Sequence, residues 1–230
     1  MKKLLIINPN SSEEMTQDIR NTVAYAIDDS FSIDVVRMEN SPHVLESFTD
    51  YTLAGAQAAI YLRRLQEHGP MPYDGVLVAC MGDPGLYAAK EVCPVPVIGI
   101  AEAAISTALL TGYRFSILAS STKAKPMMES MVMSYGLMDR MASVETFALP
   151  IDAFMEDADV LRKSIRLSAE RAAAHGADVL LLGCAGMTML SSELDTLIDL
   201  PIIDPIKAGV EQLKAMVRGG FSVSRAGLYA

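Results

Sequence analysis

The chain carries one sequence pattern twice, and this repeat constrains its fold more than any other feature. In each copy an apolar run ends in a cysteine, Cys80 or Cys184, and a glycine follows two residues later; the copies are 76–86 and 179–187. The two cysteines lie 104 positions apart, and further on a Val-Pro-Val-Ile segment is echoed by Leu-Pro-Ile-Ile at an offset of 105. We therefore predict two similar half-molecules, each bringing one cysteine to a shared cleft.

Apolar strand patterns and helical patterns alternate along both halves, which is typical of parallel sheets with helices on both faces. The expected strands are 4–8, 31–36, 75–79, 95–100, 114–119, 143–148, 179–183 and 202–203. The expected helices are 12–28, 49–68, 84–92, 101–111, a Met-rich helix around 127–133, 157–174, a helix from Cys184 to about 198, and 205–217.

These elements predict an α/β fold of two similar doubly wound domains, each with a four-stranded parallel sheet, around a shared cleft. We assign 1–100 plus 205–230 to the half with Cys80, and 101–204 to the half with Cys184. Ligands of such sheets bind at the carboxyl ends of the strands, where both cysteines fall.

Two helix starts have recognisable signals. Ser11 and Glu14 form a capping-box pattern before the first helix. Asp83-Pro84 is typical of an N-cap followed by a first helical residue, because proline lacks the N–H that would be orphaned there. We therefore interpret Asp83 as a helix cap rather than as a catalytic base.

Charge and cysteine usage exclude several classes of protein. The net charge of -9 argues against a nucleic-acid partner, which requires a basic surface. The apolar run at 4–7 is too short for an export signal, and the longest apolar stretch, 179–190, is too short for a membrane span. We expect a cytoplasmic protein without a membrane partner. Its 3 cysteines are an odd number without metal-ligand spacing, so we expect thiols rather than disulfides and no metal site.

A thiol at a strand end and just before a helix feels the helix dipole and nearby backbone N–H groups, both of which favour the thiolate. Cys93 has no counterpart in the other half and is interpreted as structural. Two thiols on opposite walls of a cleft can remove a proton from one face of a carbon and return one to the other without a cofactor. The carbon must adjoin a carbonyl, and backbone N–H groups at 81–83 and 185–187 can stabilise the resulting enolate oxygen.

Four stretches resemble the Asp/Glu/hydantoin racemase superfamily, and within it the hydantoin and allantoin racemases. They are Ile7-Asn8-Pro9-Asn10-Ser11, Ser41-Pro42 with Glu46-Ser47, Ala79 to Leu86, and Leu182 to Met187. The resemblance implies two α/β domains related by pseudo-twofold symmetry, with the active site in the cleft between them. It also implies cofactor-free racemisation in which Cys80 and Cys184 are the acid/base residues, and a homo-oligomer. Met-Gly and Ala-Gly follow the cysteines, where amino-acid racemases carry Asn-Thr and Thr-His. A neutral ring with carbonyls is therefore the expected substrate.

We predict racemisation of 5-monosubstituted hydantoins or allantoin. The candidate substrate-binding residues flank the cysteines or follow the first strand of each half: Asn10, Met81, Gly82, Asp83, Ser120, Ser121, Thr122, Ala185, Gly186 and Met187. A structural role is the alternative to substrate binding at both places. Asn10 is also typical of a turn before a capped helix, and the Ser-Ser-Thr cluster is also typical of an N-cap. The alternatives are a cofactor-free cis–trans isomerase or decarboxylase, and a non-catalytic small-molecule binding protein.

Overall fold

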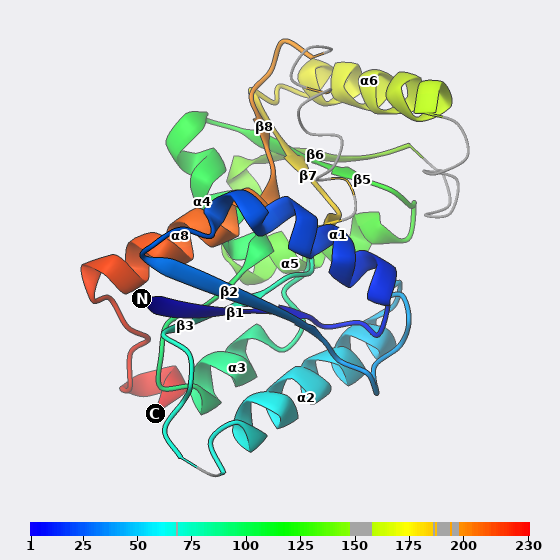
Figure 1. Ribbon diagram of the computed structural model, residues 1–230. Coiled ribbons are helices and arrows are strands. Elements are labelled where there is room, and N and C mark those ends of the chain that lie inside the picture. Colours follow the sequence, from blue (N-terminus) through cyan, green and yellow to red (C-terminus); the bar gives the residue numbers. More distant parts are fainter. Residues whose placement is uncertain (68, 148–157, 186, 188–193, 195–197) are drawn as a thin grey trace. The chain divides into compact units, whose positions relative to one another are not determined.

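The computed structural model describes residues 1–67, 69–147, 158–185, 187, 194 and 198–230. The chain divides into two compact units, one formed by Met1–Ala103 with Ile206–Ala230 and the other by Ala104–Pro205. Each unit contains a four-stranded parallel sheet with flanking helices, as the sequence predicted, and Figure 1 shows the elements along the chain.

The elements up to the end of the first sheet are, in chain order, β1 (Lys2–Asn8), α1 (Glu13–Val23), η1 (Ala24–Ala26), β2 (Phe31–Arg37), α2 (Phe48–Arg64), β3 (Gly75–Val78), α3 (Leu86–Val92) and β4 (Val97–Gly99). Those that follow are α4 (Ile100–Thr111), β5 (Phe115–Ala119), α5 (Ala124–Ser134), η2 (Met138–Arg140), β6 (Met141–Thr146), α6 (Ala158–Ala174), β7 (Val179–Leu182), β8 (Ile202–Ile203), α8 (Pro205–Gly219) and η5 (Gly227–Tyr229). The helix predicted directly after Cys184 lies largely outside the described residues.

The two sheets have the same strand order, β2-β1-β3-β4 in the first unit and β6-β5-β7-β8 in the second. In each, the chain leaves the first strand toward one edge and returns to the other side, so the topological switch point lies between β1 and β3, or between β5 and β7. Loops at the carboxyl ends of such a pair form the usual ligand site of a doubly wound sheet. Both candidate cysteines follow the second strand of these pairs.

Buried aliphatic side chains on both faces of the first sheet explain its continuous apolar strands. Leu5, Ile7, Val76 and Val78 pack with α2 and α3 through residues such as Leu62 and Ala89. On the other face, Gly75 and Leu77 lie so close to α8 that an added Cβ at Gly75 would be 2.9 Å from Leu213. Figure 1 shows α2 and α3 on one face of this sheet and α1 and α8 on the other.

The helix after the fourth strand of each sheet contributes to the other unit. Most of α4, which follows β4, belongs to the second unit, and almost all of α8, which follows β8, belongs to the first. Buried Lys214 fixes α8 within the first unit, because its Nζ donates to the Ala26 carbonyl at 2.9 Å and contacts Asp28 Oδ2 at 3.1 Å.

An aspartate joins the start of the two central strands in each unit. The Asp74 carboxylate accepts the backbone N–H of Lys3 at 2.7 Å, and the Asp178 carboxylate accepts those of Tyr113 and Arg114, both at 2.9 Å. These aspartates occupy equivalent positions of the repeat, so its local contacts, and not only its strand order, are duplicated.

None of the helices in the described part of the chain is both long and apolar enough to span a membrane.

Candidate functional site

Cys80 begins a tight turn at the carboxyl end of β3. The backbone N–H of Ala79 still donates to Ile7 of β1, at 2.8 Å, so the cysteine is the first residue beyond the ladder. The N–H of Asp83 then donates to the Cys80 carbonyl at 3.0 Å, which closes a four-residue turn. The cysteine is partly exposed and lies at the switch point of the first sheet.

Cys184 begins a turn with the same hydrogen bonds at the end of β7. Gly183 N–H donates to Leu118 of β5 at 2.8 Å, and Met187 N–H donates to the Cys184 carbonyl at 3.1 Å. Cys184 is also partly exposed. The two cysteines therefore have the same backbone setting in their separate units, as expected from the repeat. The predicted site residue Gly186 lies outside the described residues.

The turns engage some of the N–H groups that the sequence suggested as donors to a substrate. Asp83 and Met187 donate to the cysteine carbonyls, which removes both from that set. Within the described part of the chain, the N–H groups of Met81 and Gly82 have no acceptor. The side chains of Met81 and Met187 are buried, at 2% and 0% exposure, whereas Ala185 is partly exposed. In the Cys80 turn, the polar groups that remain for a ligand are therefore the backbone N–H groups of Met81 and Gly82.

Asp83 caps a different helix from the one that the sequence predicted. Its Oδ1 accepts the N–H of Ala101 at 3.0 Å and its Oδ2 that of Glu102 at 2.7 Å, so it caps α4 and not α3. The α3 helix begins only at Leu86, six residues after Cys80, behind Gly85 at φ 73°. The expectation of a helix starting at Pro84, directly behind the thiol, was therefore wrong.

The geometry around Asp83 is demanding. Asp83 has a φ of 47°, the one positive value among the non-glycine residues that the structure describes. A Cβ on Gly99 would overlap the Asp83 carboxylate, so a glycine is needed where β4 runs into α4. The turn that begins at Cys80 is thus anchored to α4 by a buried carboxylate.

Tyr51, in the first turn of α2, holds the other side of the Cys80 turn and was not predicted from the sequence. Its Oη donates to the Met81 carbonyl at 3.2 Å. Its ring lies against Gly82, where φ is 144° and a Cβ would be 2.9 Å from Tyr51 Cζ. The only sequence signal is the position of Tyr51 just after the helix start, which Ser47 caps by accepting the Asp50 N–H.

Asn10 organises the loop between β1 and α1. Its Oδ1 accepts the Ser12 N–H at 2.9 Å and Asn8 Nδ2 at 2.8 Å, and its own Nδ2 contacts Met15 Sδ at 3.2 Å. The N-cap of α1 is Ser12, whose Oγ accepts the Met15 N–H, so the predicted cap at Ser11 was wrong by one residue. These contacts match the turn role that the sequence left open for Asn10.

The Ser-Ser-Thr cluster occupies the equivalent loop after β5. Ser120 is buried, Ser121 accepts the Ala124 N–H at 3.2 Å, and Thr122 is exposed. Ser121 therefore contacts the first residue of α5, but the N-cap of that helix is Lys123, which makes no side-chain cap hydrogen bond, so the N-cap interpretation of the cluster was wrong.

Cys93 lies in the core at the end of α3. Burial raises the pKa of the Cys93 thiol, which is fully buried in the core, in agreement with a structural role. No group of three or more His, Cys, Asp or Glu residues in the described ranges could hold a metal ion.

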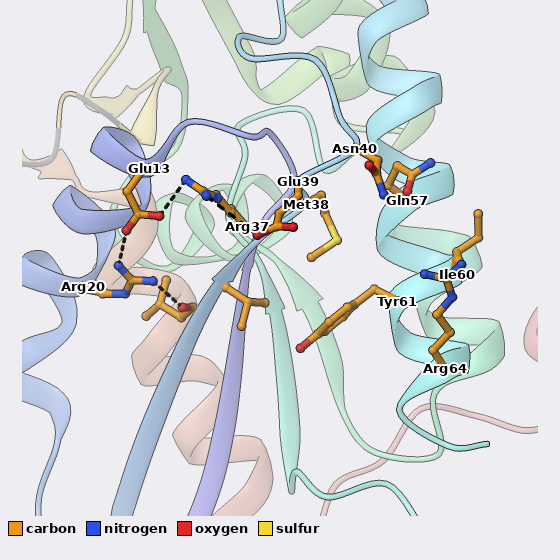
Figure 2. Close-up of a pocket in the computed structure, with 12 residues that line it drawn as sticks. Glu13, Arg20, Arg37, Met38, Glu39, Asn40, Gln57, Ile60, Tyr61 and Arg64 are labelled. Carbon is orange, nitrogen blue, oxygen red and sulfur yellow. Dashed lines mark hydrogen bonds and ion pairs between the residues drawn. The ribbon is translucent and has the colours of Figure 1, made fainter. Parts of the chain in front are cut away.

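A groove of about 420 Å³ lies over the free edge of β2, between α1 and α2, and neither candidate cysteine lines it (Figure 2). Glu13 bridges Arg20 at 2.7 Å and Arg37 at 2.8 Å on one side, and Tyr61 and Arg64 of α2 lie on the other. The groove is thus separate from the turn that begins at Cys80.

A protein-family model described as Asp/Glu/Hydantoin racemase matches residues 4–213 of the chain. The chain is 31% identical to a hydantoin racemase of Paenarthrobacter aurescens over 228 residues, covering 99% of this chain and 96% of the relative. It is 32% identical to a hydantoin racemase of Pseudomonas sp. (strain NS671), covering 99% and 90%.

Among solved structures, an allantoin racemase from Klebsiella pneumoniae is similar with a TM-score of 0.91 and 29% identity, covering 100% of this chain and 93% of that one. A mutant arylmalonate decarboxylase has a TM-score of 0.68 at 15% identity, which shows the shared fold alone. On the full-length match and these relatives, the chain belongs to the Asp/Glu/hydantoin racemase family and is an isomerase of the racemase class.

Proposed function

We propose that the protein racemises 5-monosubstituted hydantoins or allantoin by a two-thiol mechanism that uses Cys80 and Cys184. The observation that carries the proposal is the duplicated turn: each cysteine is the second residue after a central strand, β3 or β7, and its carbonyl accepts the N–H three residues later. Its relatives include proteins named hydantoin racemase and allantoin racemase, which supports the choice of substrate.

In the proposed reaction one cysteine is a thiolate and the other a thiol. The thiolate takes the proton from C5 of the ring, and the electron pair of the C–H bond moves onto the adjacent carbonyl oxygen as an enolate. The thiol of the other cysteine gives its proton to the opposite face of C5, so the stereocentre inverts and the two sulfur atoms exchange protonation states. No redox step or cofactor is needed.

The N–H groups of Met81 and Gly82 are the donors that we assign to the enolate oxygen or to the Cys80 thiolate. Both lie in a turn whose backbone is fixed by Asp83 and Tyr51, so little reorganisation accompanies the appearance of negative charge. A neutral cyclic ureide suits this lining, since the described residues of the turn place no cation beside the thiol.

The test follows single enantiomers of 5-benzylhydantoin, 5-isobutylhydantoin and allantoin in deuterated water, by polarimetry and by NMR of the C5 proton, after subtraction of the uncatalysed rate. The wild type should lose optical rotation as C5 becomes deuterated, and the substrate class follows from the relative rates. Cys80→Ser and Cys184→Ser should each abolish racemisation. Each variant should still exchange the C5 proton of one enantiomer, and the two variants should act on opposite enantiomers, because the remaining thiolate faces only one side of the ring.

Cys93→Ala is the matched control, because it removes the third thiol without touching either turn, and it should retain racemase activity. Near-normal racemisation by either Ser variant would refute the two-thiol mechanism. Tight binding of a ureide without exchange of the C5 proton would favour a binding protein instead. Product formation with loss of CO₂ from an arylmalonate would favour the decarboxylase alternative.

A further inference from the structure

The orientation of one peptide plane decides what the Cys80 turn offers to its own cysteine. The central peptide of a four-residue turn can flip, which exchanges its carbonyl and N–H between the two sides and separates the common turn types. In the turn from Cys80 to Asp83 that peptide joins Met81 to Gly82. Gly82, with φ at 144°, has the backbone freedom to permit either orientation.

Tyr51 selects one of these orientations. Its hydroxyl donates to the Met81 carbonyl at 3.2 Å, so that carbonyl points to the α2 side. The peptide is planar and trans, so the Gly82 N–H must point the opposite way, away from Tyr51. The ring also lies against the Cα of Gly82, which leaves no room for a side chain there.

In the described part of the chain the Gly82 N–H has no acceptor, and the side chain of Cys80, as a thiolate, is the candidate acceptor within the same turn. In a tight turn, the side chain of the first residue is placed to accept the N–H of the third, as Asp, Asn, Ser and Thr do in Asx and ST turns. Cysteine, like serine, has one heavy atom beyond Cβ, and a thiolate is a charged acceptor. The N–H of Asp83 closes the turn onto the Cys80 carbonyl, so it does not compete for this role.

We propose that Tyr51 is a positioning residue for Cys80: by holding the Met81 carbonyl, its hydroxyl fixes the Gly82 N–H on the side of the sulfur and so stabilises the thiolate. The proposal rests on the assignment of Cys80 as an acid/base residue, but its effect on the thiol can be measured without any substrate. Tyr51 itself exchanges no proton with the substrate.

The test uses Tyr51→Phe, which removes the hydroxyl and keeps the ring against Gly82. Tyr73→Phe is the matched control, because it removes another hydroxyl of the same unit, whose hydrogen bond goes to Asp34 at 2.8 Å and not to the turn. Both are made in a Cys184→Ala background, and the rate of alkylation of Cys80 by iodoacetamide is measured from pH 5 to 10. Peptide mass mapping assigns the label, and circular dichroism verifies the fold.

Loss of a hydrogen bond to a charged acceptor changes the equilibrium constant, here that of thiol ionisation, by about tenfold or more. Tyr51→Phe should therefore raise the alkylation pKa of Cys80 by about one unit, which is a tenfold change in proton affinity, whereas Tyr73→Phe should leave it in place. With Cys184 restored, Tyr51→Phe should lower kcat about tenfold and change KM by less than about twofold. Gly82→Ala, which displaces the ring, should shift the alkylation profile in the same direction.

An alkylation profile of Tyr51→Phe that coincides with that of Tyr73→Phe would overturn the proposal. The two proposals fail separately. A wild type that does not racemise any of the ureides refutes the proposed function, whereas the alkylation profiles still decide whether Tyr51 acts on the thiol.

Discussion

The carboxylate of Asp83 should contribute a measurable share of the stability of the first unit, through a cap between segments 18 residues apart. Asp83→Ala removes both hydrogen bonds to the start of α4, the N–H groups of Ala101 and Glu102. Loss of an N-cap costs about 0.5–2 kcal/mol, and the buried setting places this one at about 2 kcal/mol. Alanine at φ 47° adds about 1 kcal/mol of backbone strain. We therefore expect Asp83→Ala to lower the free energy of unfolding by about 3 kcal/mol.

Two companion variants separate the cap from the strain. Asp83→Gly loses the same hydrogen bonds but tolerates the positive φ, so it should cost about 2 kcal/mol, less than alanine. Asp83→Asn keeps one acceptor oxygen and tolerates this backbone region, so it should cost least of the three. The assay is urea unfolding followed by circular dichroism. The free energies of unfolding are compared with one common m-value, the slope of the free energy against urea concentration.

Gly99 provides a second route to the same contact. A Cβ at Gly99 would overlap the Asp83 carboxylate, so Gly99→Ala should displace it and cost about 2 kcal/mol in the wild type. In the Asp83→Gly background the carboxylate is gone, and the same substitution should cost less than about 0.5 kcal/mol. Additive effects of Gly99→Ala and Asp83→Gly, or a glycine at position 83 that is worse than alanine, would refute the capping geometry.

Two further predictions concern the first unit. Asp34 contacts Lys3 Nζ and Tyr73 Oη, both at 2.8 Å, and the hydrogen bond from Lys3, with that from Tyr73, lowers the pKa of its carboxyl despite partial burial. Because the folded pKa lies below the unfolded value of about 3.9, this contribution is present above that value and is lost as pH falls through the folded pKa. Asp34→Asn should thus cost about 0.5 kcal/mol at pH 7, and the difference from wild type in urea unfolding should close at low pH; a difference that grows on acidification would contradict this. Gly55→Ala should lower the midpoint of thermal unfolding, because a Cβ there would be 2.7 Å from the backbone nitrogen of Gly85 and would separate α2 from the start of α3. Helix propensity alone predicts an unchanged or higher midpoint, and that result would contradict the contact.

The repeat and the alternation of apolar patterns were sufficient to predict both parallel sheets, since these features are local in the sequence. The expected strand at 31–36 forms β2 at an edge of the first sheet, where most of its residues are only partly buried. The helix start at Asp83-Pro84 was wrong for a physical reason. An aspartate before a proline indicates that some N–H group will be capped, but not which one, and the capped groups lie 18 and 19 residues further along.

Tyr51 illustrates what sequence patterns cannot contain. Its hydroxyl meets a carbonyl 30 residues away, and that contact depends on how α2 lies beside the end of β3. Neither hydrophobic periodicity nor capping chemistry encodes such a distance. The close approach is possible because Gly82 lacks a Cβ. A glycine in a turn does not indicate, from sequence alone, which side chain will occupy the space beside it.

The crossed membership of α4 and α8 has a consequence for the history of the chain. Each half of the repeat ends in a helix that completes the other half's unit, so neither half-sequence encodes all the helices around its own sheet. A polypeptide consisting of one half would lack the helix that completes its own unit, and a second copy could supply that helix. Such a protein would be a domain-swapped dimer. Duplication and fusion of its gene would convert that exchange between two molecules into the single-chain arrangement seen here.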